Sequence, residues 1–565
     1  MNLCDYVIDT LYDNGIDTYF VITGGSIVPF INAVSKNGKV KYYCFQHEQS
    51  AAMAAEGYYR SCGKIAAVCV TSGPGVQNLL NGVCGCWYDS IPAFFITGQV
   101  NTGEDLRNFS STPRQAGFQE MPVAELFGHV TKKAMHIPNA DAIGTVLKTL
   151  ITCLKTPRYG PVLMDLPVNL QMTHLPYKIP KYIHSDKTVV DSNVNFYQLG
   201  LAPYLEESKR PLIIFGHGIK LANVCDNAIK FAENLQIPFV VSWGAFDICE
   251  TNHPLRVGSH GVYGDRCANY AVQNADLLLI LGSRLDTRQT GGNVKYFSKF
   301  SQKIMVDVDI NEINKLDERG IHIDHKLCMD LKNFLNKACL SHTRNAFLEW
   351  IHTIKKWKET YGIEKTRKGD SVVYDVLDDV FKAVEDNSII IPDQGGNLVW
   401  TMQSAKLNKT HKLFTNFGNS SMGFALPCAI GAAIGSGKTV YCIDGDGGFQ
   451  MNIQELLTVS KYKLPIHIVI LNNSGYGIIK QFQDSYFNSE YVATDKNDVF
   501  GNSVSFEEIA KLYGVHTLHD ISIPENQRIY PKLEFGNSLE NMTPYIDFEG
   551  DMLVETPPKK TEGWV

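Results

Sequence analysis

The sequence of 565 residues has no long apolar run, no basic excess and no regular cysteine framework. No apolar stretch reaches the roughly 18–20 residues that a membrane-spanning helix requires. The first 15 residues contain no basic region followed by an apolar stretch, so we expect no secretory signal. The 59 acidic residues outnumber the 52 basic ones, giving a formal net charge of −7 that argues against a nucleic-acid-binding surface. Internal repeats and low-complexity segments are also missing.

The rest of the composition is ordinary for a folded chain, with 44% hydrophobic and 20% charged residues. Fourteen scattered cysteines are typical of free, buried thiols in a reducing compartment. The length predicts three or four domains of about 100–200 residues each. We therefore expect a cytoplasmic, multidomain enzyme with room for an active site between domains.

Helical segments alternate with short, continuous apolar runs, a pattern that predicts parallel sheets covered by helices on both faces. The fold class is therefore α/β, with doubly wound parallel sheets. In the first block, Asn2–Asn14 and Gln49–Tyr59 are expected helices. The strands expected there are Thr18–Thr23, Lys41–Phe45, Ile65–Thr71, Pro92–Gly98 and Val162–Leu166.

Two polar stretches, Pro176–Asn195 and Lys355–Gly369, are expected to be linkers between blocks. They divide the chain into domains at 1–175, 190–342 and 370–530, followed by a proline-punctuated tail at 531–565. The second block is predicted to contain the strands Pro211–Gly216, Pro238–Ser242, Leu277–Leu281 and Lys303–Asp309. The third begins with a helix at Val372–Val384 and a strand at Ser388–Ile391.

The most informative motif is an apolar strand that runs into Gly445-Asp446-Gly447-Gly448, followed by a helix, a second strand and Asn472-Asn473. A right-handed crossover would make the strands parallel, so Asp446 and Asn473 would both follow carboxyl strand ends, where open α/β sheets bind ligands. Their oxygens suit Mg²⁺. Glycines there would let the backbone approach a phosphate. A plain strand-to-helix turn is the alternative for Gly-Asp-Gly taken alone.

Gly-Asp-Gly followed at this spacing by Asn-Asn resembles the signature of thiamine diphosphate enzymes. The resemblance implies that Asp446 and Asn473 hold Mg²⁺ on the cofactor diphosphate, with the Gly475 carbonyl as the third protein ligand. It also names the three domains: a pyrimidine-binding domain, a central Rossmann-like domain and a diphosphate-binding domain. The first and last of these would hold the cofactor.

The segment from Cys44 to Arg60 resembles the family's His-Glu-x-x-Ala-Ala-x-x-Ala-x-Gly-Tyr-x-Arg pattern. Glu48 is then the expected proton relay, because a buried carboxyl with a raised pKa can share a proton with a pyrimidine nitrogen. The alternative is that Glu48 only caps the Ala-rich helix.

Further segments resemble cofactor-binding elements of the family. Met422, in Gly418–Pro427, falls where a bulky apolar residue props the cofactor into a bent conformation, although a single methionine is often core filler. Gly25, in the turn after the first strand, is an expected catalytic residue. The remaining expected cofactor-binding residues are Pro74, Asn78, Gly395, Gly396, Asn397, Gly418, Gly477 and Ile478.

Within the family, the chain resembles acetolactate synthases in three segments: Gly117–Glu120, Gly282–Gly291 and Val306–Glu312. The first implies a catalytic role for Gln119 beside the substrate. The other two imply a central domain that holds FAD without using its redox chemistry. The residues expected to contact FAD are Gly216, Gly218, His260, Arg284, Arg288 and Asp307. A central domain that kept the fold and lost the flavin is the alternative.

The chain departs from the synthases at several positions. Val168 replaces a lysine, Thr287 an aspartate and Phe482 a tryptophan, and the loop after Val100 is longer. The tail resembles a branch that attaches a two-carbon unit to keto-sugar nucleotides. The segment after Thr517 is about 25–30 residues shorter than in the family, so we expect an altered sheet edge there.

The resemblance implies a carboligase that decarboxylates a 2-oxo acid, pyruvate above all, and adds the two-carbon unit to a 2-oxo acid or a keto-sugar nucleotide. Gln119, Phe482 and Arg288 would shape the acceptor side. A simple 2-oxo acid decarboxylase or lyase and a non-catalytic subunit remain alternatives. The family implies a homodimer or homotetramer, with small molecules rather than nucleic acid or membrane as partners.

Overall fold

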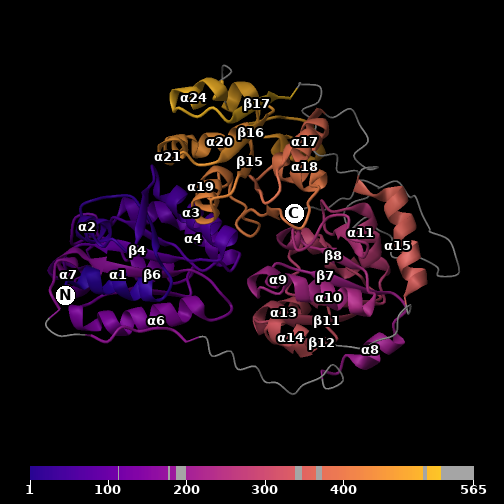
Figure 1. Cartoon of the computed structure of the whole chain (residues 1–565), viewed down its shortest axis with the longest axis horizontal. Helices are drawn as coiled ribbons and strands as arrows, with labels where there is room; N and C mark the ends of the chain where they lie inside the picture. The colour runs from indigo at the N-terminus through magenta and orange to yellow at the C-terminus, as the bar shows by residue number, and fades with distance from the viewer. Residues whose placement is uncertain are drawn as a thin grey trace. The chain divides into compact units, whose positions relative to one another are not determined.

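The computed structural model describes residues 1–111, 113–175, 179–185, 199–337, 347–363, 372–499 and 505–523 (Figure 1). These residues fall into two compact units. The first contains segments from 1–187, 387–398 and 414–524, and the second contains segments from 188–386 and 399–413. The expected tail at 531–565 lies outside the described residues.

The N-terminal part of the first unit is a six-stranded, wholly parallel sheet with strand order β2-β1-β3-β4-β6-β5. Five of its strands match the expected apolar runs, and the sequence missed β5, whose residues are exposed or only partly buried. The strands are β1 (Thr18–Val21), β2 (Lys41–Cys44), β3 (Ala67–Val70), β4 (Phe94–Gln99), β5 (Lys133–His136) and β6 (Val162–Pro167).

Helices of this part follow the predicted alternation with strands. Asn2 caps α1 by accepting a hydrogen bond from the Cys4 amide, and the apolar side of α1 enters the core. The helices are α1 (Leu3–Asp13), α2 (Val28–Lys36), α3 (Glu48–Cys62), α4 (Pro74–Tyr88), α5 (Val123–Phe127), α6 (Ile143–Lys155) and α7 (Val168–Gln171), with short 3₁₀ turns η1 (Thr102–Glu104), η2 (Leu106–Asn108) and η3 (Ala140–Ala142).

The C-terminal part of the first unit has four parallel strands in the order β13-β15-β16-β17. They are β13 (Ile389–Pro392), β15 (Val440–Gly445), β16 (Ile466–Asn472) and β17 (Leu518–Ser522). The other elements are α18 (Gly396–Ser404), which continues into the second unit, α19 (Ala425–Ser436), α20 (Asp446–Met451), η6 (Ile453–Glu455), α21 (Leu456–Tyr462), α22 (Gly477–Tyr486), α23 (Lys496–Val499) and α24 (Phe506–Leu512).

The shortened segment after Thr517 forms the edge strand β17 and pairs in register with β16. Its pairs run from Ile468 with Leu518 to Asn472 with Ser522. The sheet edge is therefore built from the residues that remain after the shortening.

Helices α3 and α19 pack closely and join the two parts of the first unit, as Figure 1 shows. The contact depends on small residues. A Cβ built on Gly57 would lie 2.0 Å from the Cys428 carbonyl oxygen, and one on Gly431 would lie 1.9 Å from the Ala54 carbonyl oxygen. Only glycine fits at either position without moving a helix backbone.

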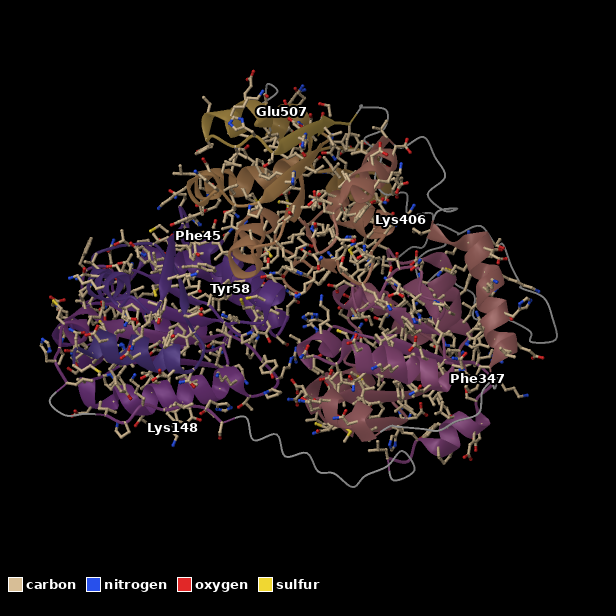
Figure 2. The ribbon with its side chains drawn as sticks, viewed as in Figure 1. Phe45, Tyr58, Lys148, Phe347, Lys406 and Glu507 are labelled. Carbon is tan, nitrogen blue, oxygen red and sulfur yellow. The ribbon has the colours of Figure 1, made fainter. Side chains whose placement is uncertain are left out.

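An aromatic cluster ties the end of β2 and helix α3 to the N-terminal sheet. The ring of Phe20 lies 5.1 Å from Phe45 and 5.8 Å from Tyr58, measured between centroids; Figure 2 labels the latter two residues. Such tilted and edge contacts are favourable ring geometries. Phe45 directly precedes the segment that starts α3, so the cluster fixes where that helix begins.

The second unit contains a six-stranded parallel sheet with order β12-β11-β10-β7-β8-β9. Its strands are β7 (Pro211–Phe215), β8 (Phe239–Val241), β9 (Arg256–Ser259), β10 (Leu277–Leu281), β11 (Gln302–Asp307) and β12 (His325–Cys328), and β14 (Lys412–Leu413) also lies in this unit. The helices are α8 (Ala202–Glu207), α9 (Gly218–Leu221), α10 (Cys225–Leu235), α11 (Arg266–Asn274), α12 (Thr287–Thr290), α13 (Ile310–Glu318), α14 (Leu331–Lys337), α15 (Leu348–Tyr361) and α17 (Val372–Ala383), with turns η4 (Trp243–Ala245) and η5 (Val294–Tyr296).

The prediction of a linker at Lys355–Gly369 is wrong in its first half, because residues 355–361 belong to α15. Trp350, Ile354 and Trp357 recur at helical spacing and pack into the core of this unit. The many lysines between them hid the pattern, since they occupy the solvent side of the helix.

The three sheets confirm the expected α/β class with wholly parallel sheets. Among the described residues, no helix is long and apolar enough to cross a membrane. Every cysteine in the described ranges is free, but the expected burial does not hold for all of them, since Cys328 is exposed.

Candidate functional site

The residues expected to bind a metal come together at the carboxyl ends of β15 and β16. Asp446 is the first residue of α20, directly after β15, and its Oδ2 accepts a hydrogen bond from the Gly475 amide at 3.1 Å. In the orientation that satisfies its neighbours, the Asn473 amide nitrogen lies 3.1 Å from Asp446 Oδ1 and 2.6 Å from the Gly475 carbonyl oxygen. The parallel pairing of β15 and β16 produces this meeting, as the spacing predicted.

Asp446 is only 3% exposed, and burial raises the pKa of its carboxyl group to about 7. A carboxylate removed from water gains from a nearby cation. The described residues contain no cluster of three or more His, Cys, Asp or Glu that could hold a metal. A cation here would take the Asp446 carboxylate and the Gly475 carbonyl, and it would turn the Asn473 amide so that its oxygen replaces its nitrogen beside them. Three such oxygens are the donor set that suits Mg²⁺.

The glycines of this turn serve two purposes. A Cβ on Gly448 would lie 2.2 Å from Asp393 Oδ2, and one on Gly447 would lie 2.4 Å from the ring of Tyr476. These two glycines are therefore required by packing within the protein. At Gly445 a Cβ would meet no protein atom within 4 Å. Of the three glycines, Gly445 is therefore the one beside which the protein leaves space for a ligand phosphate.

Asp393 lies directly after β13 and contacts the residues of this sheet edge through hydrogen bonds. Its carboxylate accepts hydrogen bonds from the Gly423 and Ala425 amides, both at 2.9 Å. Burial raises the pKa of Asp393 to about 6 and that of the neighbouring Asp444 well above the ordinary range. The residues that follow, Gly395–Asn397, are expected cofactor-binding residues, and the structure adds that Asp393 fixes the turn that follows Met422.

Met422 and the loop at 395–397 also reach this edge of the sheet. A Cβ on Gly447 would lie 3.4 Å from Met422 Cε, so Met422 lies against the Gly-Asp-Gly turn rather than deep in a core. The Asn397 side chain donates to the Ile443 carbonyl at 3.3 Å, and Gly395 adopts a φ of +114° that favours glycine.

Glu48 is the first residue of α3, which His47 caps by accepting a hydrogen bond from the Gln49 amide. The Asn78 side chain donates to Glu48 Oε2 at 3.0 Å, and a Cβ on Gly75 would lie 3.4 Å from Glu48 Oε1. The structure thus brings the expected relay together with the 74–78 segment. The expected burial is not found, because Glu48 is half-exposed in the single chain.

Two further expected residues lie at the same edge of the N-terminal sheet. Gln119 has a φ of +61°, and a Cβ on Gly73 would lie 2.9 Å from the Gln119 Cβ. The turn that contains Gly25 is held by Ser26, whose hydroxyl lies 2.9 Å from Thr71 Oγ1. Gln119 and Gly25 therefore flank the strand-to-helix turn that leads to Pro74.

The start of α3 is fixed to the C-terminal part of the same unit. Glu455 Oε1 accepts the amides of Gln46 and His47, each at 3.1 Å. Ser50 donates to Asn452 at 3.0 Å, and Asn452 donates to the Gly423 carbonyl at 2.7 Å. The helix that carries Glu48 and the turn beside Met422 are thereby connected through two side chains.

A buried ionic cluster was missed by the sequence interpretation. Arg60 bonds to Glu56 at 2.7 Å and to Asp89 at 2.6 Å, and all three side chains are almost fully buried. Asp89 in turn accepts the amides of Phe417 and Gly418 at 2.9 and 2.8 Å. The Glu56–Arg60 spacing of four residues could have indicated the first pair; the partner loop could not be found from sequence.

The residues expected to contact FAD lie at the carboxyl edge of the sheet in the second unit. Gly216 and Gly218 follow β7 and pack against Gly282: a Cβ on Gly216 would lie 2.2 Å from the Gly282 carbonyl oxygen. The Arg288 carbonyl accepts the Val262 amide at 2.8 Å, which brings the 282–291 loop to the segment after His260. The other two expected residues, Arg284 and Asp307, follow β10 and end β11.

His260 provides a test of whether a ligand fits there. Its Nδ1 lies 3.3 Å from the Val241 carbonyl oxygen. Its buried Nε2 makes no hydrogen bond of normal geometry among the described residues, although the Gln289 side chain lies close enough to interact with the ring. Burial lowers the pKa of His260 to about 4, so the ring is neutral at neutral pH. A buried polar atom without a partner is costly, and a bound polar group would satisfy it.

Comparison with known proteins finds one matching family model for each of the three sheet-containing regions. Residues 1–126 match the family model described as the N-terminal TPP binding domain of thiamine pyrophosphate enzymes, residues 200–338 match the central domain, and residues 393–538 match the C-terminal TPP binding domain. Two parallel-sheet cofactor domains and a central domain thus define the class of protein.

Individual relatives narrow this class. The chain is 31% identical to the acetolactate synthase isozyme 2 large subunit of Escherichia coli, over 92% of this chain and 91% of that protein. It is 30% identical to the acetolactate synthase large subunit of Lactococcus lactis over 98% and 92%, and 31% identical to that of Buchnera aphidicola over 86% and 85%. The chain belongs to the family of thiamine pyrophosphate enzymes that includes the acetolactate synthase large subunits. The expected class, a thiamine diphosphate-dependent enzyme similar to these synthases, is confirmed.

Proposed function

We propose that the chain is a Mg²⁺- and thiamine diphosphate-dependent carboligase that decarboxylates a 2-oxo acid, pyruvate in the first instance, and transfers the two-carbon unit to a carbonyl acceptor. The meeting of Asp446, Asn473 and the Gly475 carbonyl at one sheet edge carries this proposal. The Glu48–Asn78 pair in the other cofactor domain supports it. When bound, thiamine diphosphate supplies the carbanion that attacks the keto carbon.

The proposed role of the metal site is to bind the diphosphate of the cofactor. Asp446, Asn473 and the Gly475 carbonyl would offer three oxygens to Mg²⁺, which leaves positions for phosphate oxygens and water. Met422 beside the same turn would contact the cofactor's apolar part. Gly395, Gly396, Asn397, Gly418, Gly445, Gly477 and Ile478 complete the proposed cofactor contacts, with Gly447 and Gly448 shaping the turn.

Glu48 has the task of holding and moving a proton. Its Oε2 is oriented by Asn78, which leaves Oε1 beside Gly75 for a pyrimidine nitrogen. Binding of the cofactor and a second copy of the chain would cover this partly exposed carboxyl group. We therefore propose a homodimer or a homotetramer, in which Pro74 and Gly25 line the same site.

The acceptor side is formed by other residues. Gln119 stands at the turn beside Glu48, and Phe482 on α22 is 47% exposed, with its ring 4.7 Å from Tyr486. The extended loop after Val100 adds surface on this side. These features support an acceptor that is a 2-oxo acid or the larger keto-sugar nucleotide.

The test is to incubate purified protein with pyruvate, thiamine diphosphate and Mg²⁺, and to measure CO₂ and products with each acceptor class. A carboligase yields CO₂ and a product two carbons longer than the acceptor. Free acetaldehyde with no need for an acceptor would instead show a simple decarboxylase. Absence of CO₂ under all conditions would overturn the proposal.

A further inference from the structure

The N-terminal domain contains a second buried charge network, remote from the metal ligands. His136, the last residue of β5, lies between two carboxylates: its Nδ1 is 2.8 Å from Asp165 Oδ2, and its Nε2 is 3.3 Å from Asp105 Oδ2. The side chains are 11%, 0% and 7% exposed, respectively. Buried polar networks of this kind hold their members in fixed positions.

Asp165 anchors the network in the sheet. Its Oδ1 accepts the Thr97 hydroxyl at 2.9 Å and its Oδ2 accepts the Gln99 amide nitrogen at 3.2 Å. The same Gln99 nitrogen donates to the Met121 carbonyl at 2.8 Å. The network therefore reaches the C-terminal end of the extended loop that follows Val100.

Asp105 anchors the beginning of that loop. Arg107 forms two hydrogen bonds with the Asp105 carboxylate, at 2.8 and 2.7 Å. Arg107 Nη2 also lies 2.8 Å from His136 Nδ1, and its Nη1 lies 3.8 Å from Glu125. Both ends of the loop are thus connected to the single ring of His136.

Within the loop, Glu120 joins the two halves. Its carboxylate accepts the amides of Ala116 and Gly117, each at 3.0 Å, and that of Leu106. The neighbouring Gln119 is held with its φ at +61°, a conformation that costs a non-glycine residue free energy and persists only where its surroundings impose it. Its Cβ rests against the Gly73 turn beside the Glu48 site.

We propose that His136, through Asp105 and Asp165, is a positioning residue for the acceptor step: it fixes the extended loop so that Gln119 stands at the Glu48 site. The inference rests on the proposed carboligation. The network contacts the loop and strands β4 to β6, whereas Asp446, Asn473 and Gly475 lie in the other cofactor domain. Loss of His136 should therefore impair addition to the acceptor and leave cofactor binding and decarboxylation intact.

The test compares His136→Leu with His129→Leu, a control in which the replaced histidine is exposed. Asp105→Asn is a second variant that keeps the amide-accepting oxygen and loses the charge that faces His136 and Arg107. Three quantities are measured in the full-length protein: thiamine diphosphate affinity by calorimetry, CO₂ released per ligated product, and the rate of tryptic cleavage after Arg114, an exposed loop residue.

For His136→Leu and Asp105→Asn we expect at least a tenfold rise in CO₂ released per ligated product, cofactor affinity within about twofold of the parent, and at least fivefold faster cleavage after Arg114. His129→Leu should match the parent in all three. A parental product ratio in folded Asp105→Asn and His136→Leu would overturn the inference. If the parent releases no CO₂, the proposed function fails, and the cleavage rate still decides whether His136 fixes the loop.

Discussion

At the residue scale, Glu48 and Asn78 form the pair on which proton transfer depends. Replacing Glu48 with Gln keeps the hydrogen bond to Asn78 and removes the group that exchanges a proton. We expect kcat to fall about 10²–10⁴-fold, the usual contribution of a general acid–base group, with cofactor affinity nearly unchanged. Steady-state kinetics and calorimetry measure the two quantities.

The control for this variant is Glu359→Gln, at an exposed position of α15 in the second unit. It should retain parental turnover. Retained turnover in Glu48→Gln would assign the relay to another residue and reduce Glu48 to a helix N-terminal residue.

The raised pKa of Asp446 predicts how Mg²⁺ binding depends on pH. Because burial raises the pKa of its carboxyl group to about 7, metal must displace a proton below that pH. We expect apparent Mg²⁺ affinity to fall by about tenfold for each pH unit below 7 and to level off above it. In the metal-free protein, folding stability changes with pH in the opposite direction. Because the pKa of Asp446 is higher in the folded than in the unfolded state, its protonation stabilises the fold at acid pH, and this contribution is lost as the pH rises through 7.

Mg²⁺ titrations at pH 6, 7 and 8, followed by binding of thiamine diphosphate, measure this dependence. The Asp446→Asn variant should bind Mg²⁺ weakly, with no pH dependence in this range. Equal affinity of the parent at pH 6 and 8 would contradict the assignment of Asp446 as the ligand that titrates.

At the element scale, the contact of α3 with α19 controls where Glu48 lies. A methyl group added at Gly431 would overlap the Ala54 carbonyl, so Gly431→Ala must push the helices apart. Overpacking of this kind costs about 1–3 kcal/mol. We expect a lower thermal midpoint together with lower turnover, measured by calorimetry and kinetics.

Gly103→Ala is the matched control, because a Cβ there meets no atom within 4 Å. It should leave both quantities unchanged. An unchanged thermal midpoint in Gly431→Ala would show that the helix contact tolerates separation.

The sequence predicted some helices and strands correctly and missed others, for physical reasons. The strands read as apolar runs because both faces of a parallel sheet are covered, and Asp446 met Asn473 because parallel strands end at one edge. Strand β5 and helix α15 were missed because each buries only part of its residues. The partners of Asp89 and His136 lie on other elements, and such long-range pairs leave no periodic signal.

At the scale of the whole molecule, each of the three sheets places its expected ligand residues at its carboxyl edge. In the first unit, the residue proposed for proton transfer lies in the N-terminal part, and the proposed metal ligands lie in the C-terminal part. In the second unit, only Arg288 has an expected role in that chemistry, on the acceptor side. Its glycine turn and buried histidine need a separate physical reason.

We propose that this reason is FAD, bound at the edge of the second sheet. The buried Nε2 of His260 makes no hydrogen bond of normal geometry among the described residues, which supports a bound polar group there. We expect purified protein to be yellow and to show a flavin spectrum. The flavin should be released when the protein is denatured. His260→Phe keeps a flat ring without the polar atom, so it should lose flavin while still binding thiamine diphosphate.

His325→Phe is the matched control, since this partly buried histidine begins β12, away from the carboxyl edge of the sheet, and already has a partner in the Leu199 carbonyl. It should keep its flavin. A colourless parent that binds thiamine diphosphate stoichiometrically would show that the central domain kept its fold without the ligand. The distinction matters physically, because a buried polar atom without a good hydrogen bond costs about 1–3 kcal/mol, which a bound flavin would recover at His260 Nε2.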